Sequence, residues 1–281
     1  MFGTCAVAQS LREVDIMPPD NHRRADDERP VDGADRMKQF LEDLEHRIDP
    51  AVEENLLAQW DTFMDGEFEG DIFSPKRVRG IETKLEWPAV RVNQALADLD
   101  CMLMQQLCLA QSSVARGNGQ IACVRTNYGS SILPSVFGVK LFIMDDEYNT
   151  LPTSEPVEGG TDGVRALLDA GPPDLDAGFG ARVFEMGQRF ADAFAPYPNL
   201  RKYVHVYHPD MQGPMDVCEV IWGSGMFVEL FDKPKLVHQL LDLVTDTYIR
   251  FRARWLELMP AEGDRDTHWA LRHKGHVMLR D

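Results

Sequence analysis

The sequence predicts an α/β protein with a parallel sheet. From residue 120 onward, short runs rich in β-branched residues alternate with amphipathic helical patterns. Such alternation is typical of parallel strands joined by crossover helices, the unit from which (β/α) barrels are built. The chain of 281 residues, 44% of them hydrophobic, is long enough to bury a large core. We therefore expect a fold of the (β/α)-barrel type preceded by helices.

The first third of the chain is predicted to be an arm followed by a helical extension. Residues 1–33 are rich in Asp, Arg and Pro, which favours a mobile N-terminal arm. In residues 34–118 apolar residues recur three and four positions apart, as they do on one face of a helix. The helices predicted there cover Asp35–Ile48, Ala51–Met64 and Val92–Ala115.

Residues 119–281 are expected to be the N-terminal part of the barrel. Ile121–Gly129 is predicted to be a buried strand that runs into a polar, functional loop. Further strands are predicted at Val139–Met144, at Lys202–Tyr207 and within His268–Arg280. Helices are predicted at Ala181–Ala195, Met215–Leu230 and Pro234–Leu258. Residues 151–178 are rich in Pro, Gly and Asp, so a long surface connection is expected there.

Charge and composition exclude several classes of partner. The 46 acidic and 29 basic residues leave a formal charge of −17, which repels a phosphate backbone and argues against nucleic-acid binding. No run of about 18 apolar residues is present, so no membrane span is expected. The five cysteines form no CxxC pair and are predicted to be reduced thiols, which favours a cytoplasmic location.

Polar residues cluster where the predicted strands end, which is where barrel enzymes carry their active sites. His208 and Asp210 are the candidate catalytic residues, because an imidazole beside a carboxylate suits acid–base chemistry. An alternative is structural: His208 caps the helix that follows, and Asp210 accepts from its free amides. The candidate substrate-binding residues are Arg125, Asn127, Tyr128, Gln212, His276 and Asp281. No metal ligand is identified.

Two helix-forming stretches carry a resemblance to a known family. Gly213-Pro214 through Gly223 matches a "GP-x-x-x-A-x-x-x-x-G" pattern, with Cys218 where Ala is usual, and Pro234 through Thr245 matches "P-x-x-V-x-x-L-L-x-x-x-T". In these patterns the chain resembles the uroporphyrinogen decarboxylase superfamily, and the stretches VRTNYGSSILPSVFGVKLFIMDDEYNTLPT and WPAVRVNQALADLDCMLMQQL resemble an uncharacterised branch of it. The resemblance covers about residues 35–281.

The resemblance implies a (β/α)8 TIM-type barrel and an enzyme that acts on a tetrapyrrole or a corrinoid-linked substrate. Its partner would be a small-molecule substrate or a corrinoid protein. The Arg-Gln-Ala-Gly-Arg segment of the decarboxylases is missing, which favours zinc- and corrinoid-dependent methyl transfer over decarboxylation. The His-x-Cys zinc pattern of the methyltransferases is also missing, so any zinc ligands are expected beyond residue 281. The Asp266-Thr267-His268 run begins like a corrinoid-binding loop, but Leu271 stands where that loop has Gly.

The number of predicted strands is too small for a closed barrel, which has eight. We therefore expect about the first half of a barrel, whose inner strand faces lack partners. Candidates for such exposed positions are Val124, Val204, Val206 and Val277. A chain of this kind is expected to aggregate or to assemble with a partner, and a truncated, non-catalytic fragment remains the alternative to an enzyme.

Overall fold

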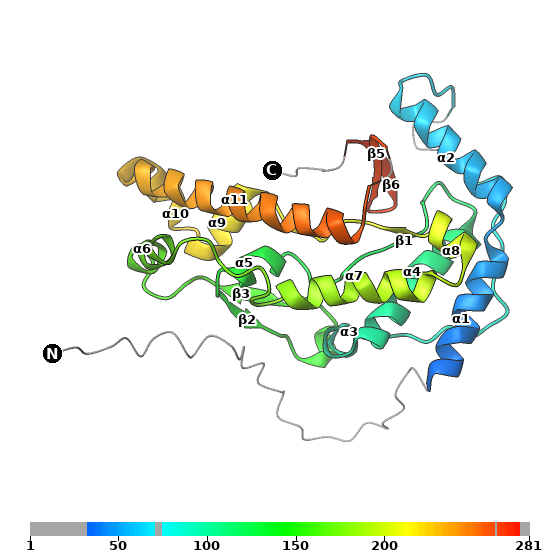
Figure 1. The fold of residues 1–281 in the computed structure, drawn as a ribbon, viewed down its shortest axis with the longest axis horizontal. Coiled ribbons are helices and arrows are strands. Elements are labelled where there is room, and N and C mark those ends of the chain that lie inside the picture. The colour runs from blue at the N-terminus through cyan, green and yellow to red at the C-terminus, as the bar shows by residue number, and fades with distance from the viewer. Residues whose placement is uncertain (1–32, 71–74, 262, 276–281) are drawn as a thin grey trace.

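Helices α7 (Gly180–Phe194) and α11 (Pro234–Leu258) run side by side through the middle of the molecule (Figure 1). The computed structural model describes residues 33–70, 75–261 and 263–275. The predicted arm lies outside these residues, except for its last residue, Gly33. Both helices were predicted within one residue of their observed bounds. Pro234 begins α11, since its fixed φ and missing N–H are tolerated in the first turn.

The remaining helices surround this pair (Figure 1). They are α1 (Gly33–Arg47), α2 (Pro50–Met64), α3 (Val92–Ala97), α4 (Leu99–Arg116), α5 (Ile132–Val136), α6 (Thr161–Ala170), α8 (Pro198–Tyr203), α9 (Pro214–Trp222) and α10 (Met226–Asp232), with a 3-10 turn at Asp146–Tyr148. The predictions for α1 and α2 are confirmed. No helix of the described residues is long and apolar enough to cross a membrane.

Three helix predictions need correction. The helix predicted at Val92–Ala115 is two helices, because Asp98 is extended and its carboxylate caps α4 by accepting from the N–H of Cys101 at 2.8 Å. The helix predicted at Met215–Leu230 is also two, separated at Gly223, whose φ of 85° ends α9. The surface connection predicted for residues 151–178 contains α6, whose Val164 is buried in the core. The high Gly and Pro content of this segment favoured a loop prediction, although α6 has an amphipathic pattern.

The described strands form three separate two-stranded sheets. Strands β1 (Cys123–Val124) and β4 (His205–Val206) pair in parallel, as the α/β prediction required. Strands β2 (Lys140–Phe142) and β3 (Thr153–Glu155) pair antiparallel, and β5 (Arg265–His268) and β6 (Leu271–Lys274) form a hairpin. The α/β class is confirmed, but the described residues form no closed barrel. The strand predicted at Val139–Met144 pairs locally with β3 instead of joining the parallel pair.

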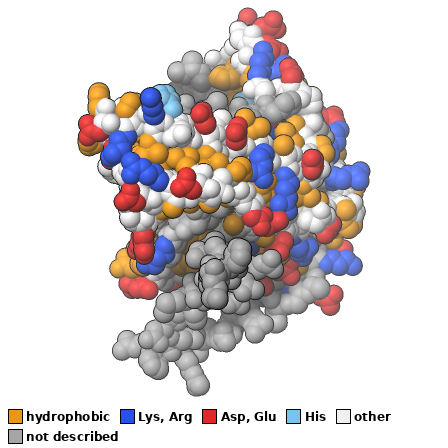
Figure 2. Space-filling model, turned by 60° about the vertical axis from the view of Figure 1, so that its left-hand side comes forward, with side chains coloured by type: hydrophobic (Ala, Val, Ile, Leu, Met, Phe, Trp, Pro, Cys, Tyr) orange, Lys and Arg blue, Asp and Glu red, His pale blue; other side chains and the backbone are white. Residues whose placement is uncertain are grey.

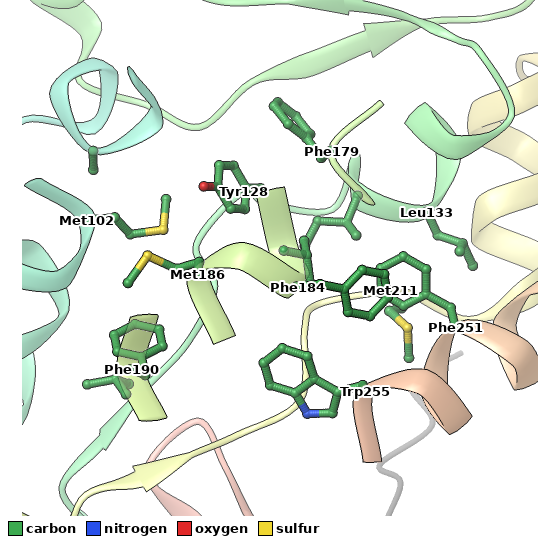
Figure 3. Packing of buried hydrophobic residues seen from close by; sticks show 14 of the residues in the cluster. Met102, Tyr128, Leu133, Phe179, Phe184, Met186, Phe190, Met211, Phe251 and Trp255 are labelled. Atoms are coloured by element: carbon green, nitrogen blue, oxygen red, sulfur yellow. The ribbon is translucent and has the colours of Figure 1, made fainter. Parts of the chain in front are cut away.

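A single large hydrophobic cluster connects most of the elements (Figure 3). It includes Val124 and Val204, which are 0% and 3% exposed, so the expectation that they lack partners is wrong. Helix α4 packs against β1, on a strand that further strands would flank in a closed barrel. Val206 is half-buried, and Val277 lies outside the described residues.

Candidate functional site

The parallel pairing of β1 and β4 brings two polar segments to one sheet edge. Cys123 lies opposite His205 and Val124 opposite Val206, so the residues that follow both strands leave the pair in the same direction. The Nη1 atom of Arg125 lies 3.5 Å from Oδ2 of Asp210, across 85 positions of sequence. The Nε2 atom of Gln212 donates to Oδ1 of Asp210 at 2.7 Å. Three of the predicted site residues therefore form one connected group.

Helix α4 holds the segment after β1 in place. Gln106 accepts from the backbone N–H of Arg125 at 3.2 Å, and Gln105 accepts from the side-chain amide of Asn127 at 3.0 Å. Gln106 is 1% exposed, so this bond is shielded from water. Asn127 therefore donates its side-chain N–H to helix α4. Its Oδ1 is buried and has no hydrogen-bond partner among the described residues.

The β5–β6 hairpin covers this edge and adds residues that the sequence analysis did not select. The ring of His268 stacks on the ring of His208, with centroids 4.3 Å apart and planes at 16°. Tyr207 meets His268 edge-on at 4.9 Å, and the guanidinium of Arg125 lies 4.5 Å from the ring centroid of Trp269. His268 is part of the partial corrinoid motif and Trp269 follows it directly, and neither residue carried any other signal in the sequence.

Unusual backbone conformations gather at the same edge. Gln212, Trp269 and Ala270 have φ values of 59°, 52° and 62°, and in the described ranges the other non-glycine residue with positive φ is Asn149. This left-handed region is unfavourable for residues with a Cβ, and such strain is found most often where function requires it. The positive φ values of Trp269 and Ala270 follow from the two-residue hairpin turn, whereas Gln212 lies outside any hairpin and its strain supports this edge as the candidate site.

The surroundings of His208 favour its neutral form. It is 5% exposed, and its Nδ1 donates to the carbonyl of Pro209 at 3.0 Å, while its Nε2 is buried with no partner among the described residues. Burial is the main cause that lowers the pKa of His208, and the nearby charge of Arg252 acts in the same direction. A neutral imidazole with a free Nε2 can accept a proton or a hydrogen bond.

The structural alternative for His208 and Asp210 is wrong. Gly213 is the N-cap residue of α9, and no side chain caps that helix. His208 bonds to Pro209 and Asp210 bonds to Gln212, so neither side chain serves the helix amides.

Tyr128 points into the core and makes its contacts there (Figure 3). It is fully buried and stacks on Phe179 with ring centroids 5.1 Å apart. Burial raises the pKa of its phenol. Its neighbours are core residues, whereas Asp210 contacts Arg125 and Gln212. His276 and Asp281 lie outside the described residues.

The described residues do not fit the zinc that the family resemblance implies. Within those ranges, no three His, Cys, Asp or Glu side chains are placed to hold one metal ion. Cys101, Cys108, Cys123 and Cys218 are free thiols, and burial is the main cause that raises the pKa of Cys123 to about 11. A thiol with a raised pKa is a poor source of the thiolate that binds zinc.

Comparison with known proteins gives one distant match. No family model matches the sequence, and no curated protein matches it. Among solved structures, a methyltransferase from Methanosarcina mazei is similar, with a TM-score of 0.46 and 19% identity. The match covers 60% of this chain and 45% of that chain, so it spans less than half of the methyltransferase. A match at this level assigns neither a family nor an activity.

Proposed function

We propose that this chain is part of an enzyme related to the uroporphyrinogen decarboxylase superfamily, and that the β1–β4 edge binds an anionic tetrapyrrole or a corrinoid-linked substrate. The observation that carries the proposal is the position of Arg125. Its side chain is only 12% exposed, and its guanidinium lies against Trp269 and Asp210 at the end of a parallel strand pair. Ligand sites of α/β proteins lie at this end of the strands.

Arg125 is suited to bind a carboxylate or another anionic group. The guanidinium offers several donors in one plane, and its contact with the Trp269 ring orients that plane. Its ion pair with Asp210 is long, at 3.5 Å, so an incoming anion competes with a weak partner. Gln212 still donates to Asp210 when Arg125 turns toward the ligand. The carboxylate of Asp210 therefore keeps one hydrogen bond when Arg125 binds the ligand.

His208 is the proposed proton acceptor of this site. Its neutral ring and its unpartnered Nε2 meet the first requirement of a general base. Among the reactions that the resemblance implies, methyl transfer is favoured over decarboxylation because the decarboxylases' arginine segment is missing. A binding module without turnover would use Arg125 in the same way but would not need His208.

Binding of two probes tests the proposal. Uroporphyrin and hydroxocobalamin are titrated into the full chain, and affinity is followed by their absorbance. For whichever probe binds, we expect Arg125→Gln to weaken its affinity by about 10-fold or more. The reason is that a charge-assisted hydrogen bond contributes about 1.5–3 kcal/mol. Arg254→Gln is the matched control, since Arg254 also lies over an aromatic ring, Phe184, and pairs with Asp176. Equal affinities of both variants, or no binding of either probe, contradict the proposal.

Turnover separates the enzyme from the binding module. Methylcobalamin is mixed with 2-mercaptoethanol and the full chain, and loss of the methyl group is followed by absorbance. We expect His208→Gln to keep probe affinity and to lower the rate by about 10²-fold or more. An unchanged rate with unchanged affinity supports the binding module instead.

A further inference from the structure

Apart from the ion pair of Asp266 with Arg252 of α11, the described part of the β5–β6 hairpin is attached to the rest of the molecule at two places (Figure 1). On one side its basic residues pair with α2: Arg272 Nε lies 2.7 Å from Asp61, and Lys274 Nζ lies 2.7 Å from Asp65. On the other side its tip lies on the strand pair, where the carbonyl of Ala270 accepts from the N–H of Ile121 at 2.9 Å. The second attachment includes the stacked histidines and covers Arg125.

The second attachment depends on uncharged histidines. The Nε2 atoms of His208 and His205 are both buried, and neither has a hydrogen-bond partner among the described residues. The Nδ1 of His205 lies 3.1 Å from the hydroxyl of Thr267 in the hairpin. A protonated ring carries two N–H donors, so each Nε2–H would be buried without an acceptor.

The charged groups around these two histidine rings do not offset the positive charge that protonation would add. Helix α11 presents Arg252, β5 presents Asp266 and His268, and β6 presents Arg272 and His273. Tyr207 lies edge-on to His268. Asp266 is the carboxylate on this side, and it already pairs with Arg252 at 3.5 Å. Asp210 is engaged by Arg125 and Gln212. Two added protons would therefore face two arginines, Arg252 and Arg272, whose carboxylate partners Asp266 and Asp61 are already paired.

We propose that the β5–β6 hairpin is an acid-released cover: protonation of His208 and His205 detaches its tip from the β1–β4 edge and uncovers Arg125. The α2 side acts as the hinge, because hydrogen bonding from Lys274, more than any other cause, holds the pKa of Asp65 below its usual range. This inference rests on the contacts of the hairpin and not on the chemistry proposed for the site.

The direction of the pH effect follows from the two pKa values. Burial lowers the pKa of His205 from 6.5 to about 4 and lowers that of His208 from 6.5. A histidine whose pKa is lower in the closed form than in the open form favours the closed form when it is neutral. The closed form is therefore fully favoured above pH 6.5, and this preference is lost as the pH falls from 6.5 toward about 4.

Hydrogen exchange tests the cover on the full chain. Exchange of peptide amides is measured by mass spectrometry from pH 7.5 to 4.5, with rates corrected for the pH dependence of the chemical step. We expect amides of β5 and β6 to lose protection by about 10-fold or more below pH 6, while amides inside α11 keep theirs. Constant protection of the hairpin overturns the proposal. Equal loss in α11 at the same pH also overturns it, because it shows global acid unfolding.

Variants assign the effect to the buried rings. Glutamine keeps a polar side chain but takes up no proton, so His208→Gln should move the loss of hairpin protection to lower pH, and so should His205→Gln. The matched control is His238→Gln, since His238 lies on the exposed face of α11. If His208→Gln does not fold, His205→Gln carries the same test alone. A pH profile that is the same in the folded variants and in the control overturns the proposal.

Discussion

At the scale of single residues, the most constrained charged side chain is Arg77. Its guanidinium is completely buried and pairs with Glu53 of α2 at 2.6 Å. It also donates to the carbonyls of Ser113, Asn118 and Gln120, so it satisfies backbone groups where α4 ends. One side chain thus links α2, the end of α4 and the segment that enters β1.

We predict that Arg77→Met lowers the free energy of unfolding by about 3–5 kcal/mol, because it leaves the buried carboxylate of Glu53 unpaired. Urea denaturation followed by circular dichroism measures the change. Lys202→Met is the control: Lys202 pairs with Glu54 on the surface and is 61% exposed, so a much smaller change than for Arg77→Met is expected. Similar losses for both variants would show that the Arg77 network is not a special source of stability.

At the scale of elements, the β5–β6 hairpin has a turn that its residues do not favour. Trp269 and Ala270 both have positive φ, a geometry for which Asn-Gly is the preferred pair in two-residue hairpin turns. The contact of Trp269 with Arg125 gives a physical reason to retain a large residue at the first position. The methyl side chain of Ala270, at the second position, has no comparable contact among the described residues that would favour it over glycine.

We predict that Ala270→Gly raises the free energy of unfolding by about 0.5–1 kcal/mol, because glycine adopts positive φ without a steric penalty. The melting temperature, measured by scanning calorimetry, should rise. Ala58→Gly is the control of opposite sign: Ala58 is exposed in the middle of α2, where glycine costs about 1 kcal/mol. A decrease in both variants would contradict the assigned turn geometry.

At the scale of the whole molecule, the surface near α10 is unusual for a chain of −17 formal charge. Figure 2, with the α6–α10 end brought forward, shows a band of hydrophobic side chains on this face. The exposed apolar residues of α10 are Phe227, Val228 and Phe231, at 49%, 62% and 87%. Contiguous apolar surface of this kind promotes aggregation.

We predict that Phe231→Glu raises the soluble concentration of the full chain and leaves its stability within about 0.5 kcal/mol, because an exposed side chain contributes little to folding. Light scattering after size-exclusion chromatography measures association. Val78→Glu adds the same charge at another exposed apolar residue, away from α10, and should improve solubility less. A wild-type chain that stays monomeric at high concentration would contradict the aggregation that we expect.

The sequence alone was sufficient to predict the α/β class, the positions of α1, α2, α7 and α11, and that the polar segments containing Arg125 and Asp210 follow the ends of strands. Helices with a continuous apolar stripe are readable because that pattern is local. The polar segments are readable because each follows a short β-branched run, and the parallel pairing of β1 and β4 places both at one edge. The breaks at Asp98 and Gly223 were missed, because capping competes with an apolar pattern that continues across them.

Only the tertiary structure decided which residues surround that edge and which do not. Asn127 bonds to α4, Tyr128 enters the core, and His268 and Trp269 arrive from a hairpin more than 55 residues away from His208. Such contacts depend on how elements distant in sequence pack together, and a one-residue change of position turns a side chain from one face of a strand to the other. The burial that keeps His208 neutral arises from the same packing, so its charge state was not readable from the sequence.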